Sequence, residues 1–213
     1  MRYLVAFDLD GTLLPINSSW ELVHRLLGTV DAVRKYRRMY ERGEISYREW
    51  AELDVSTWRG KDFSIVLREI ENIDLMDNAK EAISMLKEDG FLVGIISSGL
   101  DILAGKVCKE LNMDFCYSAR LEMNGNEVIG IKEELPPEEK GKILANVAAN
   151  FGVEIKNVGY VGDGDSDLSV FRMNIGIKIA YRPRSQEIRK LADFVANDLI
   201  EAARILVRWK GSR

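Results

Sequence analysis

The chain has 213 residues, of which 46% are hydrophobic and 30% charged, and its formal net charge is −4. This length and apolar content are enough to bury a full core, so we expect one main domain with a modest insertion. No apolar stretch approaches membrane-spanning length, and the first residues lack the pattern of a signal peptide. The sequence therefore predicts a cytoplasmic protein without a membrane partner, and its negative charge argues against a nucleic-acid partner.

Histidine and cysteine are scarce. Cys108 and Cys116 are too few and too plainly spaced for a disulfide framework or a zinc site, and we interpret both as structural residues. His24 is the only histidine and falls in a helical stretch. Because Ser–His and Cys–His nucleophile arrangements would all depend on this one residue, the sequence argues against those mechanisms.

The first predicted element is a buried strand formed by the apolar run at residues 3–6, followed by Asp8 and Asp10. In open α/β sheets ligands bind beyond the carboxyl ends of the strands, and Gly11 permits a tight turn there. The carboxylate pair suits phosphoryl transfer through a covalent intermediate, with Asp8 as nucleophile and Asp10 as acid and then base. The competing interpretation is that both carboxylates merely end a strand and cap a helix.

Residues 15–77 have a helical pattern without a clear buried strand. Amphipathic segments begin near Ser18 and run over 30–42 and 47–58, so we predict a helical cap inserted after the first strand. Such a lid would exclude water and select substrates, although a purely structural insertion would have the same pattern. We interpret the basic run at 34–40 as a solvated helix face that could also steer anionic substrates.

From Leu92 onward strands and helices alternate, which predicts a doubly wound parallel sheet. The predicted helices cover residues 78–88, 101–111, 140–151 and 199–209. The predicted strands cover residues 92–96, 115–117, 158–161, 175–179 and 194–196. One interruption is the segment 121–129, where an Asn-Gly turn within alternating residues predicts a β-hairpin.

Two polar groups accompany these elements. Ser97, Ser98 and Gly99 end the strand at 92–96, where hydroxyl and N–H groups can hold a phosphoryl oxygen or simply cap a helix. Lys140 begins a helix, and a positive charge there hints at an anionic partner, although most lysines are solvated.

A second acid cluster spans residues 162–167 and follows the strand at 158–161. Closely spaced carboxylates suit Mg²⁺, a hard cation held by carboxylates, waters and substrate phosphate. The competing interpretation is a calcium loop, but the terminal bidentate Glu of an EF-hand is missing.

Taken in this order, the four groups resemble the haloacid dehalogenase-like superfamily of phosphatases and phosphotransferases, nearest to its phosphoserine-phosphatase-like branch. The resemblance covers nearly the whole chain and implies a Rossmann-like core in residues 1–14 and 78–213 with the helical cap in 15–77. It implies a small phosphomonoester as substrate and Mg²⁺ as cofactor. Carbon–halogen-cleaving members are expected to lack the second acid, so Asp10 favours a phosphate substrate.

The resemblance also implies residue roles. Asp8 would be the nucleophile and a metal ligand, and Asp10 the acid and base with its main-chain carbonyl on the metal. Asp163 would ligate Mg²⁺ and Asp167 would support the metal shell. Phosphate binding falls to Ser97, Ser98 and Lys140, with Lys142 as the alternative lysine.

Substrate selection is expected from the cap, at Asn17, Trp20 and Asp54. Phosphoserine-specific relatives are expected to carry a glutamate and an arginine at positions that correspond by offset to Asn17 and Asp54. Neither residue has the needed charge, so phosphoserine is predicted to be a poor substrate. Phosphoserine phosphatase proper, a phosphotransferase or mutase with the same aspartyl-phosphate step, and a non-catalytic phosphate-binding module remain the alternatives.

Overall fold

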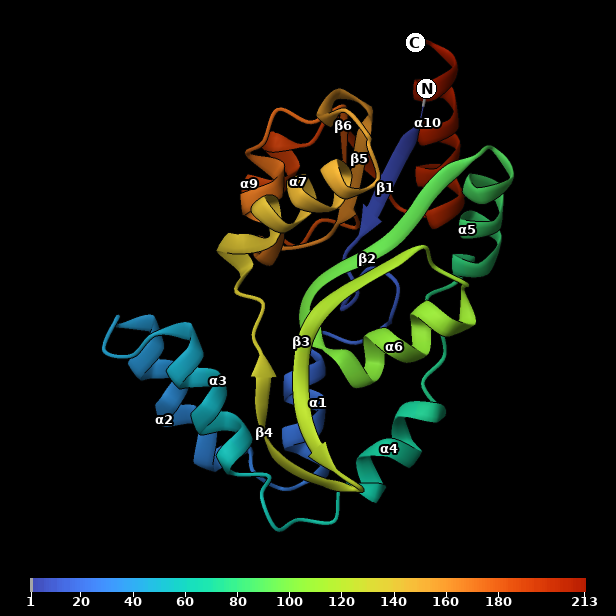
Figure 1. The fold of residues 1–213 in the computed structure, drawn as a ribbon. Helices are drawn as coiled ribbons and strands as arrows, with labels where there is room; N and C mark the ends of the chain where they lie inside the picture. Colours follow the sequence, from blue (N-terminus) through green and yellow to red (C-terminus); the bar gives the residue numbers. More distant parts are fainter. Residues whose placement is uncertain (1) are drawn as a thin grey trace.

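The computed structural model describes residues 2–213. These residues form one seven-stranded sheet with helices on both of its faces (Figure 1). The strand order is β4-β3-β2-β1-β5-β6-β7, and every neighbouring pair is parallel except β3 and β4. The strands are β1 Tyr3–Phe7, β2 Phe91–Leu100, β3 Phe115–Asn124, β4 Glu127–Glu133, β5 Val158–Gly162, β6 Ile177–Tyr181 and β7 Phe194–Ala196. The predicted α/β class with a mainly parallel sheet is confirmed.

Two layers of helices cover this sheet. One face packs against α5 Ala79–Glu88, α6 Asp101–Glu110 and α10 Leu199–Gly211, and the other packs against α7 Lys140–Asn150, α8 Leu168–Phe171 and α9 Gln186–Leu191. The two apolar clusters on opposite faces explain why β1 and β5 are buried along their whole length. Strands covered on both faces have continuous apolar runs rather than alternation, as these two do.

The segment predicted as a cap folds into helices. They are α1 Ser19–Leu26, α2 Val30–Glu41, α3 Tyr47–Ser56 and α4 Ser64–Glu71, the last of which the sequence pattern did not predict. Helices α2 and α3 lie side by side, apart from the sheet layers, and α3 packs against β4 (Figure 1). The division into a core of residues 1–14 and 78–213 and a cap of residues 15–77 stays a prediction. Met1, which that division assigns to the core, lies outside the described residues.

Strand β3 differs from the expectation of a short strand at 115–117 and a separate hairpin. It is continuous over ten residues, pairs with β2 as far as Ala119, and then pairs with β4. Ala119 and Leu121 are buried on one face of the strand. The alternation of buried and exposed residues therefore continues through the polar residues that suggested a break. The predicted turn is present, with Gly125 at φ +59°.

The cysteines also differ from expectation, because Cys108 of α6 and Cys116 of β3 form a disulfide. Within residues 2–213, no helix is both long and apolar enough to cross a membrane.

Candidate active site

Three strands bring the predicted site residues to one edge of the sheet. Phe7, at the end of β1, pairs with Ile95 of β2 and with Val161 of β5. The next residue, Asp8, donates its N–H to the carbonyl oxygen of Val161 at 2.9 Å. The loops after β1, β2 and β5 therefore meet beyond the carboxyl ends of parallel strands, where α/β proteins bind ligands.

Lys140 lies buried between two carboxylates at this edge. Its Nζ is 2.8 Å from Asp8 Oδ1 and 2.8 Å from Asp167 Oδ1, and its side chain has no exposed surface. The first turn of α7 thus points Lys140 into the site, whereas Lys142 is exposed. The structure selects Lys140 over Lys142 as the lysine that lies at the acid cluster.

Asp167 uses both carboxylate oxygens within the protein. Oδ1 also accepts from the Tyr160 hydroxyl at 2.7 Å, and Oδ2 accepts from the N–H groups of Asp163 and Gly164 at 3.1 and 3.3 Å. Asp8, Asp163 and Asp167 each offer an oxygen within 4.8 Å of the others, which is close enough for a shared cation. The hydrogen bonds of Asp167 suit a residue that orients the loop of Asp163 rather than one that is free to ligate.

Asp163 contacts a residue that the sequence analysis missed. The Nε of Arg184 lies 2.5 Å from Asp163 Oδ2, and its Nη1 donates to Asn17 Oδ1 at 3.4 Å. Asp163 Oδ1, by contrast, is buried without a hydrogen-bond partner within residues 2–213. Arg184 follows the end of β6 at the same sheet edge, and that placement was the signal that could have identified it.

Asp10 is held by the first turn of α1. The main-chain N–H and the hydroxyl of Ser19 both donate to Asp10 Oδ2, at 2.7 and 2.8 Å, while Oδ1 is buried and has no partner within the described chain. Ser19 Oγ also accepts from the N–H of Leu100 at 3.0 Å. Ser19 therefore fixes Asp10 relative to both the helical segment and β2, a contact that the sequence pattern did not predict.

Ser97 and Ser98 lie in the last part of β2, at the same edge of the sheet. A Cβ placed on the neighbouring Gly99 would lie 2.9 Å from Asp10 Oδ2 and 3.2 Å from Ser97 Oγ, so only glycine fits there. The carbonyl oxygen of Ser98 accepts a hydrogen bond from Trp20 Nε1 at 3.0 Å. The hydroxyl of Ser98 is buried and has no partner in residues 2–213.

The acid cluster holds more carboxylates than cationic side chains, since Asp8, Asp163 and Asp167 face only Lys140 and Arg184. Burial, followed by the negative charge of Asp167, raises the pKa of Asp8 to about 7 against the opposing effect of Lys140. Burial likewise raises the pKa of Asp163 to about 6, although Arg184 opposes it. Burial alone would lower the pKa of Lys140, but the charges of Asp167 and Asp8 outweigh it and raise that pKa. A divalent cation would offset this excess of carboxylate charge, and oxygen ligands of this kind suit Mg²⁺.

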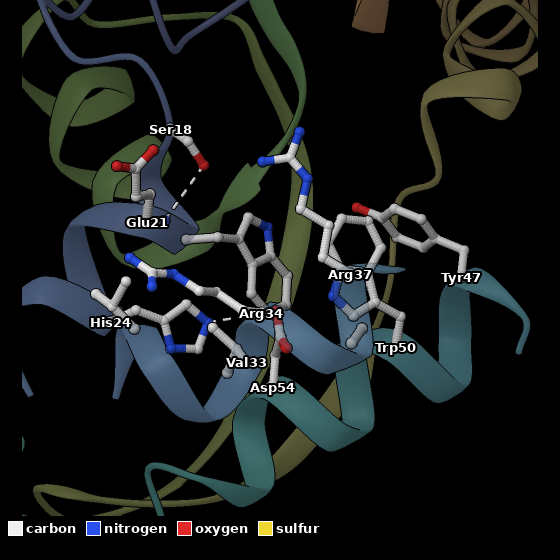
Figure 2. A pocket seen from close by; sticks show the side chains of 12 residues that line it. Ser18, Glu21, His24, Val33, Arg34, Arg37, Tyr47, Trp50 and Asp54 are labelled. Carbon is white, nitrogen blue, oxygen red and sulfur yellow. Dashed lines mark hydrogen bonds and ion pairs between the residues drawn. The ribbon is translucent and has the colours of Figure 1, made fainter. Parts of the chain in front are cut away.

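The predicted substrate-selecting residues lie in two places. Trp20 and Asp54 line a cavity of about 390 Å³ between α1, α2 and α3 (Figure 2), and Asn17 lies instead at the Arg184 side chain. Asp54 does not contact the acid cluster.

Comparison with known proteins gives the same assignment as the motifs. Residues 5–172 match the family model described as haloacid dehalogenase-like hydrolase. The chain is 29% identical over 182 residues to a phosphoserine phosphatase of Methanocaldococcus jannaschii, covering 84% of this chain and 85% of that protein. It is 32% identical over 179 residues to one of Archaeoglobus fulgidus, covering 83% of this chain but only 52% of that protein.

A solved structure of a substrate-bound phosphoserine phosphatase complex superposes with a TM-score of 0.80 at 27% identity. The match covers 96% of this chain and 98% of the other.

Proposed function

Since this chain belongs to the haloacid dehalogenase-like hydrolases, we propose that it is a Mg²⁺-dependent phosphatase that hydrolyses a small phosphomonoester through a phosphorylated Asp8. The observation that carries the proposal is the buried contact of Lys140 with Asp8, beside an Asp10 whose second oxygen has no partner in the described residues. A nucleophile held by a cation and flanked by a second acid is the arrangement that a two-step phosphoryl transfer requires.

In the first step, Asp8 attacks phosphorus. Lys140 holds Oδ1, so Oδ2 forms the new oxygen–phosphorus bond while the bond from phosphorus to the leaving oxygen breaks. Asp10 gives its proton to that leaving oxygen. Burial raises the pKa of Asp10, although hydrogen bonds from Ser19 oppose this, and so favours the protonated form that this step needs.

In the second step, Asp10 accepts a proton from water, and the water oxygen attacks phosphorus. The bond between phosphorus and Asp8 breaks, which regenerates the carboxylate and releases inorganic phosphate. Lys140, which contacts Asp8, and Ser97, which lies near Asp10, would hold the phosphoryl oxygens in both steps. Ser98, whose buried hydroxyl has no partner in residues 2–213, would join them.

Asp8, Asp163 and the main-chain carbonyl of Asp10 would hold the metal, with Asp167 as support. The fit rests on Asp163 Oδ1, a buried carboxylate oxygen without a partner in residues 2–213, and on the hard oxygen donors around it. When bound, Mg²⁺ supplies positive charge that offsets the repulsion between the carboxylates and the phosphate.

Asp8→Asn tests the proposal. Asparagine keeps the shape and can still accept from Lys140, but it removes the attacking charge, so we expect phosphate release to fall by several orders of magnitude with the fold retained. The matched control is Asp165→Asn, an exposed acid of the second cluster, which should retain activity. Rapid quench with labelled substrate should place phosphate on Asp8. An active Asp8→Asn variant, together with wild-type protein that takes up no label, would show that covalent catalysis is wrong.

A further inference from the structure

The cavity between α1, α2 and α3 begins where the catalytic loops end. Ser18 and Trp20 line it, while Ser19 between them donates to Asp10 and Trp20 donates to the carbonyl oxygen of Ser98. A phosphoryl group at Asp8 would therefore direct its leaving group toward this cavity. At about 390 Å³, the cavity has ample room for a small organic leaving group.

Asp54 supplies the buried charge of this cavity. Its side chain is only 7% exposed, and its Oδ1 has no hydrogen-bond partner within residues 2–213. Burial raises the pKa of Asp54, and hydrogen bonding by the side chains of His24 and Trp50 opposes that effect. A buried carboxylate oxygen without a partner is costly unless a ligand donates to it or pairs with its charge.

His24 does not supply that pairing charge. Two groups face His24 Nδ1: the Thr29 hydroxyl at 2.8 Å, which can donate or accept, and Trp58 Nε1 at 3.0 Å, which can only donate. Because Trp58 requires an acceptor, Nδ1 is assigned as one. The ring proton then lies on Nε2, 3.3 Å from Asp54 Oδ2, and in this tautomer the imidazole carries no charge. His24 orients Asp54 and leaves its negative charge available to a ligand.

Aromatic rings form the other walls. Trp20, Tyr47 and Trp50 line the cavity, where Figure 2 labels Tyr47 and Trp50. Trp50 is also held by stacking on Tyr40, with ring centroids 4.6 Å apart. A cation in such a cavity is attracted in two ways. The aromatic rings attract it through their quadrupoles, and the carboxylate attracts it through its negative charge.

Two arginines of α2 also line the cavity, but they are bound elsewhere. Arg34 lies 3.1 Å from Asp31 and Arg37 lies 2.9 Å from Glu41, and their side chains are 66% and 71% exposed. Solvent and these acids screen both guanidinium groups, whereas Asp54 acts inside the low-dielectric cavity. The net preference of the inner cavity is for positive charge.

We propose that the leaving group is an amino alcohol, so that the substrate is a phosphomonoester with a cationic nitrogen, bound by Asp54 and the rings of Trp20, Tyr47 and Trp50, and without a carboxylate. This inference rests on the proposed function and specifies its substrate class. A carboxylate on the same leaving group would meet Asp54 and be repelled.

Three matched esters test the substrate class. Phosphoethanolamine differs from phosphoserine only by the carboxylate, and ethyl phosphate lacks the nitrogen altogether. With wild-type enzyme and Mg²⁺, we expect kcat/KM for phosphoethanolamine to exceed that for either of the others by about tenfold or more. Equal or faster turnover of phosphoserine or ethyl phosphate would overturn the inference while leaving the phosphatase activity established.

Asp54→Asn tests the residue, with Glu52→Gln as the matched control on the exposed face of α3. We expect the Asn variant to lose the preference for phosphoethanolamine over ethyl phosphate, and the Gln variant to keep it. An unchanged preference in a folded Asn variant would show that Asp54 does not select the cation. If that variant does not fold, the three-ester comparison decides alone.

A binding measurement separates this inference from the proposed function. Choline and its uncharged isostere 3,3-dimethylbutan-1-ol can be titrated against tryptophan fluorescence without any turnover. If no ester is hydrolysed, the proposed function fails, and the cavity is then judged by this titration. Quenching by choline but not by the isostere supports a cation site, and equal responses overturn it.

Discussion

At the scale of single residues, Asp10 combines a fixed oxygen with a free one. Ser19 donates twice to Oδ2, and Oδ1 has no partner in the described chain. The free oxygen can carry a proton to a leaving group, and the raised pKa of Asp10, caused mainly by burial, keeps that proton bound to a higher pH than in an exposed aspartate.

We predict that Asp10→Asn affects substrates unequally. An alkoxide needs a proton to leave and a nitrophenolate does not, so phosphorylation by alkyl phosphates should slow by about 10²–10⁴-fold, and by p-nitrophenyl phosphate much less. Single-turnover kinetics on both esters would measure this. In the wild type, alkyl ester cleavage should decline as pH rises through the Asp10 pKa, without such a decline for the nitrophenyl ester. Equal losses on both esters would argue against Asp10 as the proton donor.

Local patterns predicted most of the residues that meet at the acid cluster. Asp8, Asp163 and Asp167 follow buried strands, and parallel strands end at one edge, so their proximity follows from the sheet. The choice of Lys140 over Lys142 depends on the rotation of α7, which two lysines at a helix start do not define. Arg184 was missed because its contact with Asp163 depends on a loop path after β6.

At the scale of elements, the disulfide between Cys108 and Cys116 ties α6 to β3. The bridge closes a short loop, with a sequence separation of 8 residues. A loop of this size should contribute about 2–3 kcal/mol by restricting the unfolded chain.

We predict that a reducing agent lowers the melting temperature by about 4–12 °C, since each kcal/mol shifts Tm by about 2–4 °C in a chain of this size. Thermal unfolding with and without dithiothreitol would measure the shift. The double variant Cys108→Ser with Cys116→Ser should melt at the lower temperature in both conditions. A wild-type melting temperature that does not respond to the reducing agent would contradict the prediction.

The bounds of the long core helices were predicted more closely than the end of β3. The pattern for α7 at 140–151 matches the observed Lys140–Asn150, because an amphipathic period persists over several turns. The end of β3 could not be placed in this way, since the strand continues only because β2 and β4 flank it. Tertiary pairing decides such boundaries, and it leaves little trace in the local sequence.

At the scale of the whole molecule, the sheet class was predictable but its strand order was not. β1 lies at the centre because β2 and β5, which are separated by 57 residues of other elements, pair on its two sides. Nothing local in β1 distinguishes these partners from other apolar strands. The central position matters, because it places Asp8 between the end of β2, which supplies Ser97, and the loop after β5, which supplies Asp163.

That central position also links metal binding to global stability. Asp8 and Asp163 follow different strands of one sheet, so unfolding separates them and destroys the metal site. A ligand that binds only the folded state stabilises it by about 2.7 kcal/mol at 100 times its Kd. Mg²⁺ at that excess should raise Tm by about 5–10 °C. Thermal unfolding with Mg²⁺ and with a chelator measures this directly.

Asp163→Asn should lose the shift in Tm because it removes a ligand charge, whereas Asp165→Asn should keep it, because Asp165 is exposed in the same loop. A shift that survives Asp163→Asn would place the metal elsewhere, and no shift in the wild type would remove the metal from the proposal.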